Sequence, residues 1–262
     1  MKVFITGASS GIGEALANEY AKRYKNDNTI IGLAARRSEH LQNLQKSLKE
    51  KFNIECVTYT LDVRDHQQLS AAAADFIQQH GSPDVVIANA GVSSGTLTEQ
   101  QQDIAAFQAV MDINVLGLVH TFQPFITAMR NAGKGHLVGI ASVAGVRGLP
   151  GAGAYSASKA AAIAYLESLR VEMSHHNIAV TTIAPGYIRT PMTDINTYSM
   201  PFLMDADIAA NKFVSAIENK RRFIVIPWQM GWVARLMRFI PPVLWDFLAK
   251  NAPHKPRIKV EK

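Results

Sequence analysis

The feature that most limits the fold is a regular alternation of short, β-branched apolar runs with longer helical patterns. The predicted strands span residues 2–6, 29–34, 54–60, 84–89, 136–141, 178–184 and 222–226. The predicted helices lie between them, near residues 11–24, 38–51, 65–80, 99–131, 153–175 and 205–219. Continuously apolar strands indicate burial on both faces of a sheet, and alternation with helices indicates βαβ units. The sequence therefore predicts an α/β protein with a doubly wound parallel sheet of about seven strands, in a three-layer α/β/α sandwich.

Length and composition favour one large domain. The chain has 262 residues, of which 48% are hydrophobic, and we expect a domain over residues 1–227 with a C-terminal amphipathic helical extension over 228–262. The single cysteine, Cys56, allows no intramolecular disulfide. The first predicted strand begins at once, so we expect no signal peptide, and no uninterrupted apolar run reaches the ~18 residues of a membrane span. We therefore expect a cytoplasmic protein, with a peripheral membrane location as the alternative.

The charge distribution argues against a nucleic-acid partner. The net charge is +6, but residues 220–262 hold ten Lys/Arg and two Asp/Glu, a net charge of +8. The basic character thus belongs to the C-terminal tail, and no nucleic-acid-binding module is recognisable. The eight histidines and one cysteine show no spacing typical of a metal site, so no metal is expected.

A glycine-rich segment, TGASSGIG, follows the first predicted strand and opens a helix. Its glycines are Gly7, Gly11 and Gly13. Glycine lets the backbone turn sharply and approach a phosphate, and a helix N-terminus offers free N–H groups to an anion. The second predicted strand is followed by Arg36 and Arg37, where an acidic residue would hold the ribose of NAD. Because arginine pairs well with phosphate, the sequence favours the 2′-phosphate of NADP(H).

The segment YSASK places Tyr155 four residues before Lys159. On a helix, both side chains lie on one face. A cation near a phenol lowers the phenol pKa from its usual value near ~10, which suits proton transfer at neutral pH. The spacing alone is common on helix surfaces, so other motifs must decide its meaning.

Taken together, these motifs resemble the short-chain dehydrogenase/reductase family, in its single-domain form with a Rossmann-like fold. TGASSGIG resembles the family's TGxxxGxG loop, and YSASK its YxxxK motif. The matching positions run in order from residue 6 to residue 190, although Ala88 stands where a second asparagine is common. The resemblance implies cofactor-binding roles for Gly7, Ser9, Ser10, Gly11, Ile12, Gly13, Arg36, Arg37, Asp62, Val63, Asn89, Ala90, Gly91, Tyr155, Lys159, Pro185, Gly186, Ile188 and Thr190.

The same resemblance implies a catalytic set of Asn114, Ser142, Tyr155 and Lys159. Tyr155 would exchange a proton with the substrate oxygen, and Lys159 would lower its pKa and bind the nicotinamide ribose. Ser142 would polarise the carbonyl, and Asn114 would hold a water that joins Lys159 to solvent. We therefore expect an NADP(H)-dependent enzyme that interconverts a carbonyl and an alcohol by hydride transfer, and we expect it to reduce an apolar aldehyde or ketone. A non-catalytic dinucleotide-binding sensor or scaffold is the alternative, and a membrane-surface lipid reductase is another.

The segment after Thr190, PMTDINTYSMPFLM, mixes apolar and turn residues, as a lid over an apolar small-molecule substrate would. On a helical wheel, the tail residues Trp228, Trp232, Leu236 and Phe239 form one apolar face. Such a face can pack on its own domain, rim the substrate pocket, meet a partner subunit or lie in a membrane surface. We expect residues 228–249 to form a helical cap that mediates association. The resemblance implies a homodimer or homotetramer whose main interface uses the helices near 99–131 and 153–175.

Overall fold

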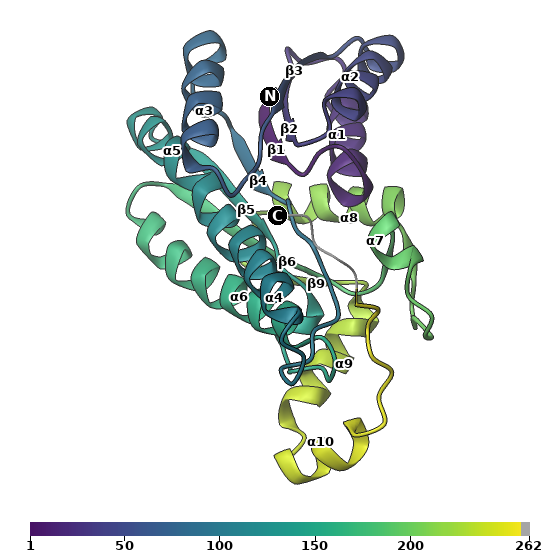
Figure 1. Cartoon of the computed structure of the whole chain (residues 1–262). Helices are drawn as coiled ribbons and strands as arrows, with labels where there is room; N and C mark the ends of the chain where they lie inside the picture. Colours follow the sequence, from purple (N-terminus) through teal and green to yellow (C-terminus); the bar gives the residue numbers. More distant parts are fainter. Residues whose placement is uncertain (258–262) are drawn as a thin grey trace.

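Seven parallel strands form the central sheet (Figure 1). The computed structural model describes residues 1–257. The strands are β1 (Lys2–Thr6), β2 (Ile30–Ala35), β3 (Glu55–Thr60), β4 (Val85–Ala88), β5 (Gly135–Ile140), β6 (Ile178–Pro185) and β9 (Phe223–Ile226). Their order across the sheet is β3-β2-β1-β4-β5-β6-β9. The predicted doubly wound parallel sheet is confirmed, and every strand begins and ends within one residue of the expected position.

The order of the strands reverses at β1. The pairing of β1 with β2 runs in register from Lys2↔Ile30 to Thr6↔Ala34, and its pairing with β4 includes Val3↔Val85. The chain therefore leaves β1 toward one side of the sheet and continues from β4 toward the other. Connections that follow β1 and β4 diverge, which opens a crevice at the carboxyl edge of the sheet.

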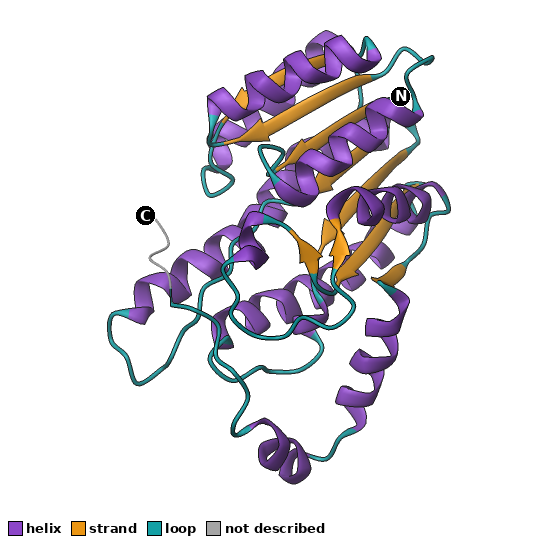
Figure 2. Cartoon of the chain, turned by 90° about the vertical axis from the view of Figure 1, so that its right-hand side faces the viewer, coloured by secondary structure: helices purple, strands orange, loops and turns teal. Residues whose placement is uncertain are grey.

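Helices cover both faces of the sheet (Figures 1 and 2). One face packs against α1 (Gly11–Arg23), α2 (Ser38–Phe52) and α8 (Ala206–Glu218), whose buried residues share one core cluster. The other packs against α3 (His66–His80), α5 (Gly117–Ala132) and α6 (Gly153–Ser174), which share a second cluster. The sheet is thus apolar on both sides, as the continuously apolar strands require.

The predicted helix near 99–131 is instead a composite of three elements. It consists of α4 (Asp103–Met111), a π-helical turn η1 (Asp112–Leu116) and α5. It begins at Asp103 rather than near residue 99, because the Asp103 carboxylate accepts a hydrogen bond from the Leu97 N–H at 2.9 Å and closes the preceding turn. Over Asp103–Ala132 it is long and apolar enough to cross a membrane by length and composition. Its side chains Phe122, Phe125 and Met129 are fully buried against the sheet.

Four short elements were not predicted. They are η2 (Val143–Gly145), β7 (Ile188–Arg189), α7 (Pro191–Asp194) and β8 (Met204–Asp205). All of them are too short to produce a recognisable hydrophobic period. They follow β5 and β6, so they belong to the edge of the sheet where the crevice opens.

The C-terminal extension forms two helices that project from the sheet, α9 (Trp228–Phe239) and α10 (Pro242–Ala249) (Figure 2). One face of α9 packs on the domain, since its residues Met230 and Ala234 are each only 4% exposed. The outward-facing stripe of Trp228, Trp232, Leu236 and Phe239 is between 62% and 82% exposed.

The sequence-based option that this stripe packs on its own domain is therefore wrong. The reason lies at Gly186, where a Cβ would lie 2.7 Å from the Met230 Cγ, so this glycine makes room for Met230 and the helix docks through the face of Met230 and Ala234. Arg147 fixes this arrangement by donating hydrogen bonds to the Met237 and Ile240 carbonyls at 3.1 and 2.9 Å. Residues 258–262 of the predicted extension lie outside the described residues.

The packing of α5 gives a stability prediction. Phe125 is fully buried, and its ring centroid lies 4.8 Å from that of Phe4. Phe125→Ala is expected to lower the free energy of unfolding by about 3–5 kcal/mol, because the large cavity cannot be refilled. Phe247→Ala on α10 is the control, since Phe247 is 65% exposed. Chemical denaturation followed by circular dichroism measures both, and equal stability of the two variants would contradict the packing described here.

Candidate active site

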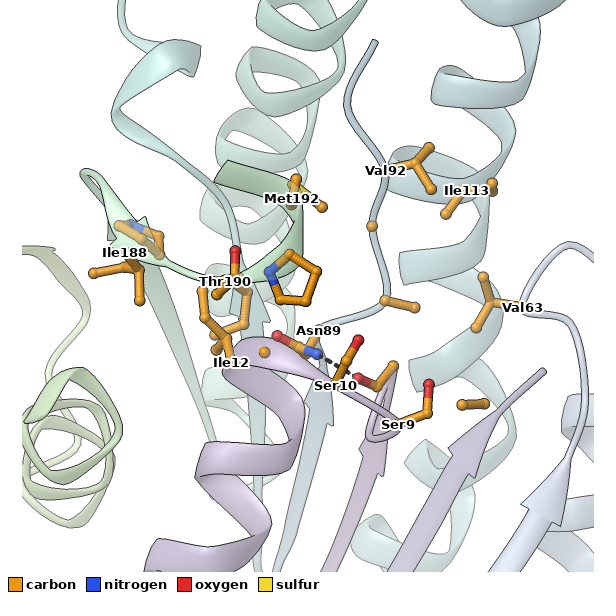
Figure 3. A pocket seen from close by; sticks show the side chains of 18 of the residues that line it. Ser9, Ser10, Ile12, Val63, Asn89, Val92, Ile113, Ile188, Thr190 and Met192 are labelled. Atoms are coloured by element: carbon orange, nitrogen blue, oxygen red, sulfur yellow. Dashed lines mark hydrogen bonds between the residues drawn. The ribbon is translucent and has the colours of Figure 1, made fainter. Parts of the chain in front are cut away.

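A cavity of about 390 Å³ opens at the carboxyl edge of the sheet. Figure 3 shows side chains from the start of α1, from the segment after β4 and from α7 directed toward it. The predicted binding residues that line it are Gly7, Ser9, Ser10, Gly11, Ile12, Arg36, Arg37, Asp62, Val63, Asn89, Ala90, Gly91, Tyr155, Lys159, Pro185, Gly186, Ile188 and Thr190. One cavity thus brings together residues spread over more than half of the sequence.

The cavity also has walls that sequence reasoning missed. They are Ala35, Leu61, Val92, Ile113, Ile140 and Ala141, whereas Pro191, Met192 and Thr193, which also line the cavity, belong to the segment predicted as a lid. The first two and the pair at 140–141 stand at strand ends, and that position was the available signal. The others depend on how the connecting segments fold back, which no local pattern predicts.

The glycine loop is shaped by close backbone contacts. Gly7 has a φ of +69°, and a Cβ there would lie 2.8 Å from the Ala90 Cα. The Asn89 side chain holds the loop by donating hydrogen bonds to the Thr6 and Gly7 carbonyls at 3.1 and 3.2 Å. Gly13 does not line the cavity; its lack of a side chain lets α1 pack against the Gly7 carbonyl. The first N–H groups of α1 have no partner within the helix and so can bind an anion.

The two arginines after β2 have different surroundings. The Arg37 guanidinium donates hydrogen bonds to the Ser9 and Ser10 hydroxyls at 3.0 and 2.7 Å, so it braces the glycine loop. Arg36 is exposed on the cavity wall, and no described residue forms an ion pair or hydrogen bond with it. Arg36 is therefore the cation that remains available for a phosphate.

Asp62 at the end of β3 is already paired. Its carboxylate accepts hydrogen bonds from the Arg64 guanidinium, at 2.7 Å to Nη2. Burial acts to raise the Asp62 pKa, but the hydrogen bonds and positive charge of Arg64 outweigh it and hold the pKa below its usual value. The carboxylate keeps its charge at the cavity wall, beside Val63.

Tyr155 and Lys159 lie near the start of α6, as the YxxxK spacing predicts. The Lys159 ammonium lies 5.8 Å from the centroid of the Tyr155 ring and donates a hydrogen bond to the Ile140 carbonyl at 2.9 Å. Ser142 follows β5, where its hydroxyl accepts a hydrogen bond from the Ala144 N–H at 3.1 Å. The end of β5 therefore positions both Lys159 and Ser142 around the phenol.

The pKa of Tyr155 differs from the sequence-based expectation. Burial raises the pKa of the phenol above its usual value, and a hydrogen bond with Ser142 acts in the opposite direction. Burial also lowers the pKa of the Lys159 ammonium to about 8. The expected lowering of the Tyr155 pKa is thus not observed, because the loss of water around the phenol exceeds the effect of its neighbours.

Asn114 lies in the π-helical turn, 1% exposed and behind the cavity wall. Its side-chain amide accepts a hydrogen bond from the Val92 N–H and donates one to the Val92 carbonyl, both at 2.9 Å. A Cβ on Gly91 would lie 3.2 Å from the Asn114 Oδ1 and 3.5 Å from the Lys159 Nζ. The glycine therefore keeps a gap between these two polar atoms. The wide turn of a π-helix is a common way to direct one side chain into a functional site.

The segment after β6 closes one side of the cavity. Ile188 in β7 is buried, and Thr190 caps the start of α7, where the Thr190 N–H donates a hydrogen bond to the Thr193 hydroxyl at 2.9 Å. This turn holds Met192 at the cavity wall (Figure 3). Within residues 1–257, no group of three or more His, Cys, Asp or Glu side chains is placed to hold a metal ion.

Comparisons with known proteins agree with this geometry. A family model described as short chain dehydrogenase matches residues 1–199. An uncharacterized oxidoreductase of Myxococcus xanthus is 34% identical over 248 residues, which cover 94% of this chain and 95% of the relative. A short-chain dehydrogenase from Sphingobium yanoikuyae in complex with NADPH has a TM-score of 0.76 at 25% identity, covering 92% of this chain and 96% of its own. A 3-oxoacyl-(acyl-carrier protein) reductase from Brucella melitensis with bound NAD has a TM-score of 0.73 at 26% identity, covering 86% and 88%.

The buried Lys159 predicts a pH dependence of stability. Its pKa in the folded protein is about 8, below the ~10.4 of an unfolded chain. Between these values the unfolded state binds a proton that the folded state has lost, so this group makes stability rise with pH, by at most about 1.4 kcal/mol per pH unit. As the pH falls toward the folded pKa, the contribution is lost.

Lys159→Met should therefore remove an upward slope between about pH 8 and 10. Urea denaturation of the wild type and the variant over this range measures the difference, in which other titrating groups cancel. The same substitution at the exposed Lys212 is the control. Parallel profiles for wild type and Lys159→Met would refute the description of Lys159 as a buried ammonium.

Proposed function

Because this chain belongs to the short-chain dehydrogenase/reductase family, we propose that it is an NADP(H)-dependent oxidoreductase that interconverts a carbonyl and an alcohol. In the cell it reduces an apolar aldehyde or ketone. One observation supports this most strongly: Tyr155 and Lys159 line the cavity, and the Ser142 hydroxyl lies close enough to Tyr155 to influence its pKa. A dinucleotide-binding cleft that ends at a phenol suited to proton transfer is what such a reaction requires.

The residues of the cavity fit a nicotinamide dinucleotide phosphate. The tight approach of Gly7 to the 89–91 segment leaves the start of α1 open to a pyrophosphate. Arg36 is free to pair with a 2′-phosphate, while Arg37 braces the loop through Ser9. Asp62 and Val63 form the wall for the adenine. When bound, the cofactor supplies or accepts the hydride.

The protein's own side chains supply position and the proton. In the reducing direction the Tyr155 hydroxyl donates its proton to the substrate oxygen, a role for which a raised pKa keeps the phenol protonated at neutral pH. Ser142 orients the carbonyl by a hydrogen bond. Lys159, fixed by the Ile140 carbonyl, places a positive charge beside the ring. Asn114 fixes the Val92 backbone, and Gly91 leaves a gap between Asn114 and Lys159 that suits the water expected to join Lys159 to solvent.

We also propose a cytoplasmic homodimer or homotetramer. Apolar side chains on α4 and η1 support this, since Ile104, Phe107 and Leu116 are 65%, 41% and 49% exposed. The exposed stripe of α9 favours a second candidate, a lipid reductase at a membrane surface, because the same tail is basic and anionic headgroups attract lysine and arginine. A non-catalytic dinucleotide sensor is a weaker alternative, since binding alone has no use for Tyr155.

The catalytic proposal is tested by Tyr155→Phe. The variant keeps the ring but lacks the proton donor, so turnover is expected to fall by roughly 10²–10⁴-fold while NADPH still binds. NADPH oxidation with a panel of aldehydes and ketones measures turnover, and calorimetric titration measures binding. Tyr165→Phe, on the same helix, is the control. Near-normal turnover by Tyr155→Phe would disprove the mechanism.

The cofactor proposal is tested by Arg36→Asp. A charge-assisted contact with phosphate is worth about 1.5–3 kcal/mol, so NADP affinity should fall by roughly one to two decades, while NAD affinity is retained. Titration of both cofactors into wild type and variant measures this. Lys51→Asp on α2 makes the same change of charge at an exposed site. The proposal fails when the wild-type protein binds NAD as tightly as NADP.

A further inference from the structure

The segment after α10 returns to the candidate active site. Figure 1 shows it as the yellow loop that rises from α10 toward the sheet. The Gly95 N–H donates a hydrogen bond to the Pro256 carbonyl at 2.9 Å. Gly95 belongs to the loop after β4, which contributes Val92 to the cavity wall. We call residues 252–257 the C-terminal strap.

The loops on which the strap lies are shaped to receive it. A side chain at Gly95 would collide with the Lys255 carbonyl, and a Cβ on Gly151 would lie 2.6 Å from the His254 Cγ. At its far end the Arg257 guanidinium pairs with the Asp103 carboxylate at 2.8 Å. Asp103 is itself fixed by the Leu97 N–H. Close packing at Gly151 and Gly95 and the ion pair with Asp103 therefore fix the strap on both sides of Lys255 in the sequence.

The packing of the strap places a second ammonium, that of Lys255, beside Tyr155. The Lys255 Nζ lies 5.6 Å from the centroid of the Tyr155 ring, a distance similar to the 5.8 Å of Lys159. Lys159 donates a hydrogen bond to the Ile140 carbonyl, whereas no described residue forms an ion pair or hydrogen bond with the Lys255 ammonium. Burial lowers the pKa of Lys255 to about 8. A half-buried cation without a counter-ion is costly, and an anion placed against it would remove that cost.

We propose, on the premise of the reductase function above, that Lys255 binds an anionic group of the substrate. The substrates are then carbonyl compounds that carry a carboxylate, or a comparable anion, on an apolar frame. The apolar frame of such a substrate matches apolar cavity walls such as Val92 and Met192. Its anionic group supplies the counter-ion that the Lys255 ammonium beside Tyr155 lacks. This narrows the substrate class beyond the apolar aldehyde or ketone expected from sequence.

Two matched aldehydes test the inference. The first, 4-formylbenzoate, carries a carboxylate, and the second, methyl 4-formylbenzoate, carries a neutral ester on the same ring. The measured quantity is the ratio of their kcat/KM values in NADPH oxidation. Lys255→Met is expected to lower this ratio about ten- to a hundredfold, the size of a lost charge-assisted contact. Lys255→Arg is expected to retain most of the preference.

The control is Lys250→Met, which removes the same charge from an exposed lysine at the end of α10. It is expected to leave the ratio and the activity unchanged. If Lys255→Met reduces turnover of both aldehydes equally, Lys255 acts only on Tyr155, and the inference is overturned. A wild-type enzyme that does not prefer the carboxylate would overturn it as well.

A binding measurement separates this inference from the proposed function. Benzoate and benzamide are titrated calorimetrically into the full chain saturated with NADP. Benzoate is expected to bind more tightly than benzamide, and Lys255→Met to abolish the difference. If benzoate binds in this way but neither aldehyde is reduced, the reductase proposal fails and the anion site remains. If the aldehydes are reduced but benzoate shows no binding that depends on Lys255, the anion site alone is refuted.

Discussion

The parallel pairing of the seven strands is the constraint on which the rest of the molecule depends. Because every strand runs in the same direction, every connection that follows a strand begins at one edge of the sheet. The glycine loop after β1, the arginines after β2, Asp62 after β3 and Ala141 after β5 are brought together in this way. The register of the sheet thus brings these segments to one edge, and long-range hydrogen bonds, such as those from Asn89 to the Thr6 and Gly7 carbonyls, then fix them in place.

The same sheet supports a cation in a dry environment. Lys159 is only 5% exposed, and its main partner is the carbonyl of Ile140, the last residue of β5. A neutral carbonyl offsets only part of the cost of burying an ammonium, which is why the pKa of Lys159 falls to about 8. This burial lowers local stability beside the phenol that we propose as the proton donor, and desolvated groups are common at functional sites.

Sequence reasoning succeeded where a short pattern contains the whole physical cause. Buried strands are apolar along their length, a helix places Tyr155 and Lys159 on one face, and the glycine loop is read from its spacing. It failed where the outcome depends on distant partners. The π-helical turn around Asn114 depends on the Val92 backbone. The outward direction of the apolar stripe on α9 depends on contacts at Gly186 and Arg147. Lys255 reaches Tyr155 because the C-terminal strap packs closely on Gly95.

The C-terminal extension joins an exposed apolar surface to Tyr155, the proposed proton donor. Arg147 binds the carbonyls at the end of α9 and also lies 5.0 Å from the Trp245 ring on α10, so the two helices are held as one unit. Only five residues of chain lead from Lys250 at the end of α10 to Lys255, a span of at most about 17 Å. The position of the ammonium beside Tyr155 therefore depends on where α10 lies. A partner subunit or membrane that covers α9 and α10 and displaces α10 would therefore displace Lys255 as well. The residues between Lys250 and Lys255 are too few to absorb a large movement.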